Sequence, residues 1–207
     1  MKKLLVAISL LMCSFITAAD GPWFGDKILY HNSFATLAGQ DISDKLAPVL
    51  GSENLYYVSG HNYKAYTEKK QLLELYTGKT NQLQYFINGQ ASSISSMDAA
   101  TGTPGAVVKP LLGKATIAGY ACQSLQTDTD GNTSVYYFSP EVRVNAALYS
   151  KHLAGDWATF LNASHGALPL KFTVTNRKQG FVTTSEATSV EAMPLVATEF
   201  ATDAPAR

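Results

Sequence analysis

The sequence predicts a mainly β protein of the α+β type, a single mostly antiparallel domain with two helical pieces. Short runs rich in Tyr, Val, Thr, Leu and Phe recur along the 207 residues and end at Gly, Asn or Asp, which is typical of strands and turns. Consecutive runs are separated by tight turns, as neighbouring antiparallel strands require. Helical spacing of apolar residues occurs in only two stretches.

The expected strands follow from period-two patterns and turn residues. The clearest is "LPLKFTVT", in which Leu168, Leu170, Phe172 and Val174 alternate with other residues, as in a half-buried strand. The full set of expected strands is 26–35, 54–59, 63–68, 72–77, 82–87, 91–97, 117–127, 133–140, 168–175 and 180–190.

The first expected helix lies in "QDISDKLAPVLG", where Ile42, Leu46 and Leu50 are four residues apart. Asp41 can cap its N-terminus, Gly51 can end it, and Pro48 strains it. The second runs from about 145 to 163, with a break expected at Gly155-Asp156. Its apolar stripe consists of Tyr149, Leu153, Trp157, Phe160 and Leu161, and such a stripe fits onto a sheet.

One domain is expected over residues 20–203, followed by a frayed tail at 204–207. Between its halves, residues 98–113 lack a clear period and contain three glycines and two prolines. We therefore expect a long surface loop there. Such loops serve either as lids or as plain connections.

Residues 1–19 have the pattern of a secretory signal peptide, with Lys2 and Lys3, the apolar run 4–16 and small residues at 17–19. A periplasmic or secreted protein that begins near Asp20 is therefore expected. Lipidation of Cys13 is not expected, because Met12 stands where lipid attachment needs a small residue. The apolar run is short for a transmembrane span.

Without Lys2 and Lys3, 14 basic residues remain against 16 acidic ones, a formal charge of −2. This charge gives no reason to expect nucleic acid as a partner. Cys122 is then the only cysteine, so no internal disulfide is expected, and a packed thiol is favoured over a nucleophile because no His or Lys adjoins it.

The acidic stretch Asp128, Asp130 and Asn132 raises the question of a calcium loop. An EF-hand-type loop needs a closing Glu about 12 residues after its first ligand, but the next acid is Glu141, beyond Pro140. Asp130-Gly131 between two expected strands instead favours a hairpin turn.

The stretch "TIAGYACQSLQTDTDGNTSVYYFSP" resembles a family of bacterial secreted proteins of unknown function related to the GLPGLI family. The matching structural residues are Gly119, Tyr120, Cys122 and the turn Asp130-Gly131, followed by an aromatic strand. "ALPLKFTV" and the closing strand to Phe200 also look like the family, whereas Ala167 departs from it. The resemblance implies the fold of periplasmic lipoprotein carriers, a strongly curved antiparallel sheet or incomplete barrel wrapped around helices with an apolar interior.

No catalytic motif is present, and no enzyme activity is expected. GxSxG, HExxH and CxxC are all absent, and His31, His61, His152 and His165 have no metal-ligand spacing. We therefore expect no catalytic residues, no metal site and no cofactor. An unrecognised hydrolase is kept as a third hypothesis.

Many aromatic residues lie on strands that should be neighbours, and two interpretations stay open. They either fill a core or, in a curved sheet, line an apolar pocket. In the second case a hydrophobic small molecule or lipidated protein would be the partner. The expected cavity-lining residues are Tyr57, Tyr85, Tyr137, Trp157, Phe160 and Phe172.

The leading functional hypothesis is thus a non-catalytic envelope protein that binds a hydrophobic ligand in the concavity of its sheet. The alternative is an envelope structural or interaction protein with a filled core, acting through an edge strand or the 98–113 loop. The oligomeric state does not follow from the sequence.

Overall fold

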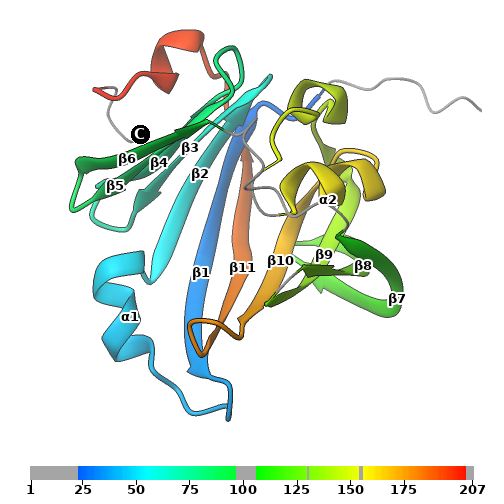
Figure 1. Ribbon diagram of the computed structural model, residues 1–207. Coiled ribbons are helices and arrows are strands. Elements are labelled where there is room, and N and C mark those ends of the chain that lie inside the picture. The colour runs from blue at the N-terminus through cyan, green and yellow to red at the C-terminus, as the bar shows by residue number, and fades with distance from the viewer. Residues whose placement is uncertain (1–22, 97–105, 130, 154–155, 204–207) are drawn as a thin grey trace, which may run out of the picture.

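The computed structural model describes residues 23–96, 106–129, 131–153 and 156–203 (Figure 1). Within these ranges eleven strands form one open antiparallel sheet in the order β6-β5-β4-β3-β2-β1-β11-β10-β9-β8-β7. The predicted fold class, a mainly antiparallel sheet with helices, is confirmed. The strands are β1 (Asp26–Thr36), β2 (Glu53–Ser59), β3 (Asn62–Thr67), β4 (Leu72–Thr77), β5 (Gln82–Ile87), β6 (Gln90–Ser96), β7 (Val107–Ile117), β8 (Tyr120–Thr129), β9 (Asn132–Arg143), β10 (Ala167–Asn176) and β11 (Phe181–Ala192).

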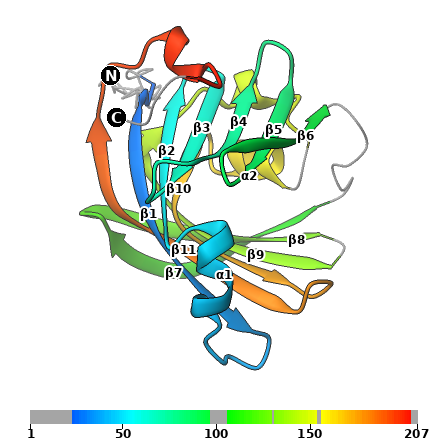
Figure 2. The same cartoon turned by 90° about the vertical axis from the view of Figure 1, so that its left-hand side faces the viewer.

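The long central strands β1 and β11 join the two halves of the sheet. The β2–β6 half is a plain meander, and β11 returns the chain to the centre after the β7–β10 half. Because each strand pair adds twist, the halves diverge on either side of α2 (Trp157–Ala163) in Figures 1 and 2. The sheet is therefore concave toward α2.

A short helical segment spans the concavity and is tied to both halves. It contains the 3₁₀ helix η1 (Ala146–Tyr149) and α2. On one side Asp156 accepts hydrogen bonds from Tyr136 Oη at 2.7 Å and from Thr127 Oγ1. On the other side Asn81 Nδ2 donates to the Lys151 carbonyl at 2.8 Å.

The helix expected at 145–163 is thus two shorter pieces. The predicted break at Gly155-Asp156 falls immediately before α2, although residues 154–155 lie outside the described ranges. Leu153, expected on the apolar stripe, is 45% exposed. The stripe is interrupted because Leu153 follows η1 in a non-helical stretch, where the spacing of 3.6 residues no longer applies.

The other helix, α1 (Ser43–Leu50), lies beside β1 and none of its residues is buried (Figure 1). The expected stop signal is confirmed, but the N-cap residue is Ile42, which makes no side-chain capping hydrogen bond, and the predicted cap Asp41 lies one residue before it. Asp41 Oδ1 accepts a hydrogen bond from the Ser43 backbone N–H at 2.8 Å, and Gly51 ends the helix with φ +84°. Positive φ favours glycine at this position.

The loop expected at 98–113 ends earlier than predicted, because residues 107–113 form the first part of β7. Residues 97–105 lie outside the described ranges. β7 is an edge strand, the position in a sheet at which proline is tolerated. A register shift between Leu111 and Lys114 contains Gly113, so the residues that suggested a loop instead mark an irregular edge strand.

Hydrophobic residues pack on both faces of the β2–β5 half. The larger cluster lies on the concave face and includes Phe160 and Leu161 of α2. The smaller cluster lies on the opposite face, around Tyr57, Tyr66 and Phe86, and is covered by Phe200 of the C-terminal 3₁₀ helix η2 (Ala197–Phe200). Figure 2 shows η2 above these strands and α2 behind them.

A buried lysine holds this C-terminal cover in place. Lys64 is 1% exposed, and its Nζ donates to the carbonyls of Glu199 at 3.2 Å and Ala201 at 2.5 Å. The ammonium also lies 5.0 Å from the Tyr66 ring centroid, within the range of a cation–π contact. The charged ammonium group of Lys64 thus binds backbone carbonyls of the C-terminal segment.

Removing the Phe200 ring should therefore destabilise the domain. We expect Phe200→Ala to lower the free energy of unfolding by about 3 kcal/mol, as measured by urea denaturation. Val196→Ala in the same segment is the matched control, since Val196 is 55% exposed and should change stability by less than about 0.5 kcal/mol. Equal effects of the two substitutions would contradict the proposed packing role of Phe200.

Candidate binding cavity

A cavity of about 290 Å³ lies between the concave face of the sheet and the helical segment. Its walls are mostly apolar and aromatic. The residues that line it are Ile28, Tyr30, Tyr56, Val58, Tyr63, Glu74, Leu83, Tyr85, Tyr136, His152, Trp157, Leu168, Pro169, Phe172 and Val174.

The floor on the β2–β5 side is built from two rows of paired residues. In the first row Tyr56, Ala65, Glu74 and Tyr85 are cross-strand partners on β2, β3, β4 and β5. Partners in register point to the same face. The small side chain of the fully buried Ala65 leaves room above it, and across this gap the Tyr56 hydroxyl donates to Glu74 Oε1.

The second row consists of Val58, Tyr63, Tyr76 and Leu83 on the same four strands. The rings of Tyr63 and Tyr76 stack with centroids 5.1 Å apart. Tyr76 is fully buried, and its hydroxyl donates to Asn81 Oδ1 at 2.8 Å. This row is thus a packed layer that supports the cavity.

The opposite wall comes from β1 and β10. The Tyr30 hydroxyl donates to the Pro169 carbonyl at 2.6 Å, and the Tyr30 ring meets Phe172 edge-on at a centroid distance of 5.7 Å. Leu168, Phe172 and Val174 share this face, as their alternation predicts. One hydrogen bond and an edge-to-face ring contact thus hold Tyr30 in this wall.

His152 and Trp157 form the roof. His152 is 3% exposed, and its Nε2 lies 2.9 Å from the Tyr63 hydroxyl. No described residue bonds His152 Nδ1 or Trp157 Nε1. The contact with Tyr63 ties the roof to the floor, and Trp157 meets the same ring edge-on at 6.1 Å.

Burial governs the ionisation of the polar residues around the cavity. Desolvation raises the pKa of Glu74, and the hydrogen bond from Tyr56 opposes this rise. Desolvation lowers the pKa of His152 to about 4, so this imidazole is neutral near pH 7. Burial also raises the pKa of Tyr85 to about 12, which keeps its hydroxyl protonated.

The structure brings together three of the six residues expected to line a cavity: Tyr85, Trp157 and Phe172. Phe160 is fully buried beneath the cavity, with its ring 4.3 Å from that of Tyr136. It supports the wall and does not line it. Whether these residues contact a ligand stays a prediction.

Tyr57 and Tyr137 lie elsewhere. Tyr57 belongs to the cluster on the opposite face of the sheet. The residue before it, Tyr56, lines the cavity instead. Likewise Tyr136 lines the cavity, whereas the Tyr137 side chain lies beside Gly113 of β7. Its hydroxyl is 3.3 Å from the position that a Cβ on Gly113 would take. Alternation along a strand separates adjacent tyrosines onto different faces.

Sequence reasoning did not select Glu74. A signal was present, because Glu74 and Tyr76 are two residues apart in "LLELYT" and therefore share a face of β4. An acid on the face of an apolar strand is unusual enough to mark a candidate site. His152 was considered among the histidines without metal-ligand spacing and, with His165, as a residue that the hydrolase hypothesis would place beside a carboxylate.

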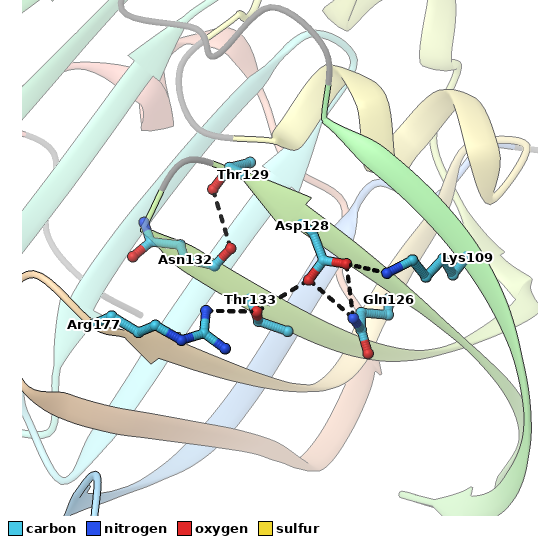
Figure 3. A network of polar contacts seen from close by, with 7 residues as sticks. All are labelled: Lys109, Gln126, Asp128, Thr129, Asn132, Thr133 and Arg177. Atoms are coloured by element: carbon cyan, nitrogen blue, oxygen red, sulfur yellow. Dashed lines mark hydrogen bonds and ion pairs between the residues drawn. The ribbon is translucent and has the colours of Figure 1, made fainter.

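The acidic stretch forms a structural network at the β8–β9 hairpin, shown in Figure 3. Asp128 pairs with Lys109 Nζ at 2.7 Å and accepts hydrogen bonds from Gln126 at 2.9 Å and Thr133 at 3.0 Å. The hydrogen bonds from Lys109 and then Gln126 lower the Asp128 pKa. Asp130 lies outside the described residues.

Other residues of this stretch also have structural surroundings. Gly119 lies at φ +87° between β7 and β8, and the neighbouring Tyr120 is half-buried. Cys122 is 4% exposed, and burial raises its thiol pKa. Across the described residues, no group of three or more His, Cys, Asp or Glu side chains is arranged to hold a metal ion.

Comparison with known proteins adds little to these observations. No protein-family model matches the sequence, and no curated protein matches it. The resemblance to the GLPGLI-related family therefore stays a prediction. None of the helices in the described ranges is long and apolar enough to cross a membrane.

Among solved structures, the chain is similar to PNGF-II in its P21 crystal form, with 13% identity and a TM-score of 0.45 over 84% of this chain and 30% of that one. It is also similar to MucB, with 9% identity and a TM-score of 0.39 over 87% of this chain and 58% of that one. A third similar structure is an outer membrane lipoprotein-sorting protein domain from Vibrio parahaemolyticus. It has 10% identity and a TM-score of 0.26 over 85% of this chain and 89% of that one. The chain thus spans less than two thirds of PNGF-II and MucB, and TM-scores below 0.5 support no functional argument.

The buried neutral His152 should make stability depend on pH. Its folded-state pKa of about 4 lies below the ordinary 6.5, so the unfolded state binds the proton more readily. The associated stability is present above pH 6.5 and is lost as the pH falls toward about 4. The shift corresponds to about 3 kcal/mol.

We therefore expect the free energy of unfolding to fall more steeply between pH 7 and pH 4.5 in the unsubstituted protein than in His152→Gln, as measured by urea denaturation at each pH. His31→Gln is the control, because His31 is an exposed histidine of the same sheet and should leave the pH profile unchanged. Identical profiles for all three proteins would show that His152 is not buried in its neutral form.

Proposed function

We propose that this protein is a non-catalytic binding protein of the bacterial envelope, periplasmic or secreted, that takes a hydrophobic ligand in the cavity beneath α2. The observation that carries the proposal is the cavity itself. It has a volume of about 290 Å³, close to the lower end of the 300–1,000 Å³ that is typical of ligand pockets. A volume of this size suits a small apolar molecule or part of one chain of a lipidated partner.

The chemistry of the walls supports binding over catalysis. Aromatic and aliphatic side chains dominate the lining, and the polar groups on it are tyrosine hydroxyls, Glu74 and His152. No described pair of cavity residues forms a nucleophile with an adjacent base, since the His152 Nε2 contact is with a tyrosine hydroxyl. That arrangement favours recognition of a ligand.

The alternative function, partner binding at a sheet edge, draws support from the exposed apolar residues of β7. Leu112 is 101% exposed and Val107 is 53% exposed. However, β7 also carries Lys109, Pro110 and a register shift. These are the features by which natural proteins prevent edge-to-edge pairing, so the cavity is the better supported site.

Binding can be tested by blocking the cavity. Val174 on β10 lines it, and we expect Val174→Trp to weaken uptake of an apolar fluorescent probe by more than about tenfold, because the indole would occupy the free volume. Val135→Trp is the matched control. Val135 is also half-buried in the sheet but does not line the cavity, so its substitution should leave probe affinity unchanged.

The natural ligand can be sought by mass spectrometry of organic extracts from the purified protein. An apolar compound should be recovered from the unsubstituted protein and from Val135→Trp, but not from Val174→Trp. Absence of both bound compound and probe uptake in the unsubstituted protein would contradict the proposed function.

A further inference from the structure

Glu74 is chemically distinct from the rest of the cavity wall. Among the described residues that line the cavity, it is the only acidic side chain, and none of them is a lysine or an arginine. A carboxylate next to apolar walls is costly unless a partner compensates its charge. An acid with no counter-charge among the described residues therefore calls for an explanation in terms of what the cavity holds.

The protein itself supplies only part of that compensation. The Tyr56 hydroxyl donates to Glu74 Oε1, but in the described chain no hydrogen bond to Oε2 and no ion pair to Glu74 is formed. The ion pairs found there join other residues, namely Lys27 with Glu191, Lys109 with Asp128, and Lys171 with Glu186. A counter-charge for Glu74 would thus come from a bound molecule.

Aromatic rings surround the same part of the cavity. Tyr56 and Tyr85 belong to the row that contains Glu74, and Tyr85 is its direct partner across β4 and β5. The Tyr56 ring lies 5.6 Å from Tyr30 and 6.4 Å from Tyr63, measured between centroids. These rings border the same cavity as Glu74, and the electron-rich faces of aromatic rings attract ammonium groups.

The remaining ligand chemistries fit less well. An anionic head group would face Glu74 without any described cation on the lining to receive it. A purely apolar ligand would leave the carboxylate desolvated, with the hydrogen bond from Tyr56 as its only described compensation. An ammonium group satisfies the carboxylate and the rings together.

We propose that the cavity selects organic ammonium compounds, in which a positively charged nitrogen is attached to an apolar body, with Glu74 as counter-ion and the tyrosine rings around it. The apolar body would occupy the part of the cavity lined by Leu168, Phe172 and Val174. This inference rests on the proposed function, since it names the class of ligand for the same cavity.

The test compares three ligands with the same chain length by calorimetry or probe displacement: octyltrimethylammonium, octanol and octanoate. We expect octyltrimethylammonium to bind at least about tenfold more tightly than octanol, which corresponds to about 1.4 kcal/mol. Octanoate should bind more weakly than octanol, because its charge repels Glu74.

Glu74→Gln keeps the shape of the side chain and removes its charge. In this variant the preference for octyltrimethylammonium over octanol should fall to less than about threefold, while the affinity for octanol stays unchanged. Glu68→Gln is the control, because Glu68 is exposed and does not line the cavity, and it should retain the full preference. Unchanged octanol binding also shows that Glu74→Gln is folded.

The pH dependence provides a second readout on the unsubstituted protein. Burial raises the pKa of Glu74, so acidification should protonate it and weaken octyltrimethylammonium binding without affecting octanol. Among the other described titratable groups on the lining, His152 becomes charged only near pH 4. The remaining ones are tyrosines whose pKa values burial raises, so they stay protonated on acidification: Tyr30, Tyr56, Tyr63, Tyr85 and Tyr136. In Glu74→Gln, any remaining loss of binding should be confined to the range near pH 4.

The outcomes separate this inference from the proposed function. Equal affinities for all three ligands in the unsubstituted protein, or a preference that persists in Glu74→Gln, would overturn the ammonium specificity and leave a hydrophobic binding protein. Binding of none of the three, together with no uptake of the apolar probe, would overturn both.

Discussion

The structure depends on the bridge that the helical segment, described at 146–153 and 156–163, makes across the concave face of the sheet. Asp156 anchors it to Tyr136 on β9 and Thr127 on β8, whereas Lys151 and His152 anchor it to Asn81 and Tyr63 on the other half. An open antiparallel sheet has no closure of its own to fix its curvature. The bridge supplies that constraint, and the cavity is the space left between it and the sheet.

A single small residue makes room for the polar contact on the cavity floor. Because Ala65 is fully buried between Tyr56 and Glu74, the tyrosine hydroxyl can reach the carboxylate two strands away. A larger residue at this position would fill the gap and separate the two groups. Burial of the acid lowers the stability of the fold, as is common where a binding group must be held in place. This cost of burial supports the ligand recognition that we propose for the cavity.

The β2–β5 half is covered on both faces, which departs from the usual one-sided pattern of an antiparallel sheet. β3 shows this most clearly, since Tyr63 faces the cavity cluster whereas Lys64 and Tyr66 face the C-terminal segment. Because apolar residues occupy both faces, strand patterns here do not reveal which face encloses the cavity. This is why Tyr57 was expected at the site that Tyr56 occupies.

Most strand positions and turns, and the antiparallel order of neighbours, follow from the sequence alone, because they depend on local alternation and on turn residues such as Gly60, Asn88 and Gly131. The exception is β7, whose glycine and proline predicted a loop and whose turn into β8 falls inside the expected strand 117–127. The alternation in "LPLKFTVT" even identified Phe172 correctly as an inner-face residue. Only the tertiary structure decided which faces meet. The Tyr56–Glu74 contact joins residues 18 apart and the Tyr63–His152 contact joins residues 89 apart. Such pairs depend on sheet register and on the path of the bridging segment, and neither is encoded in a local period.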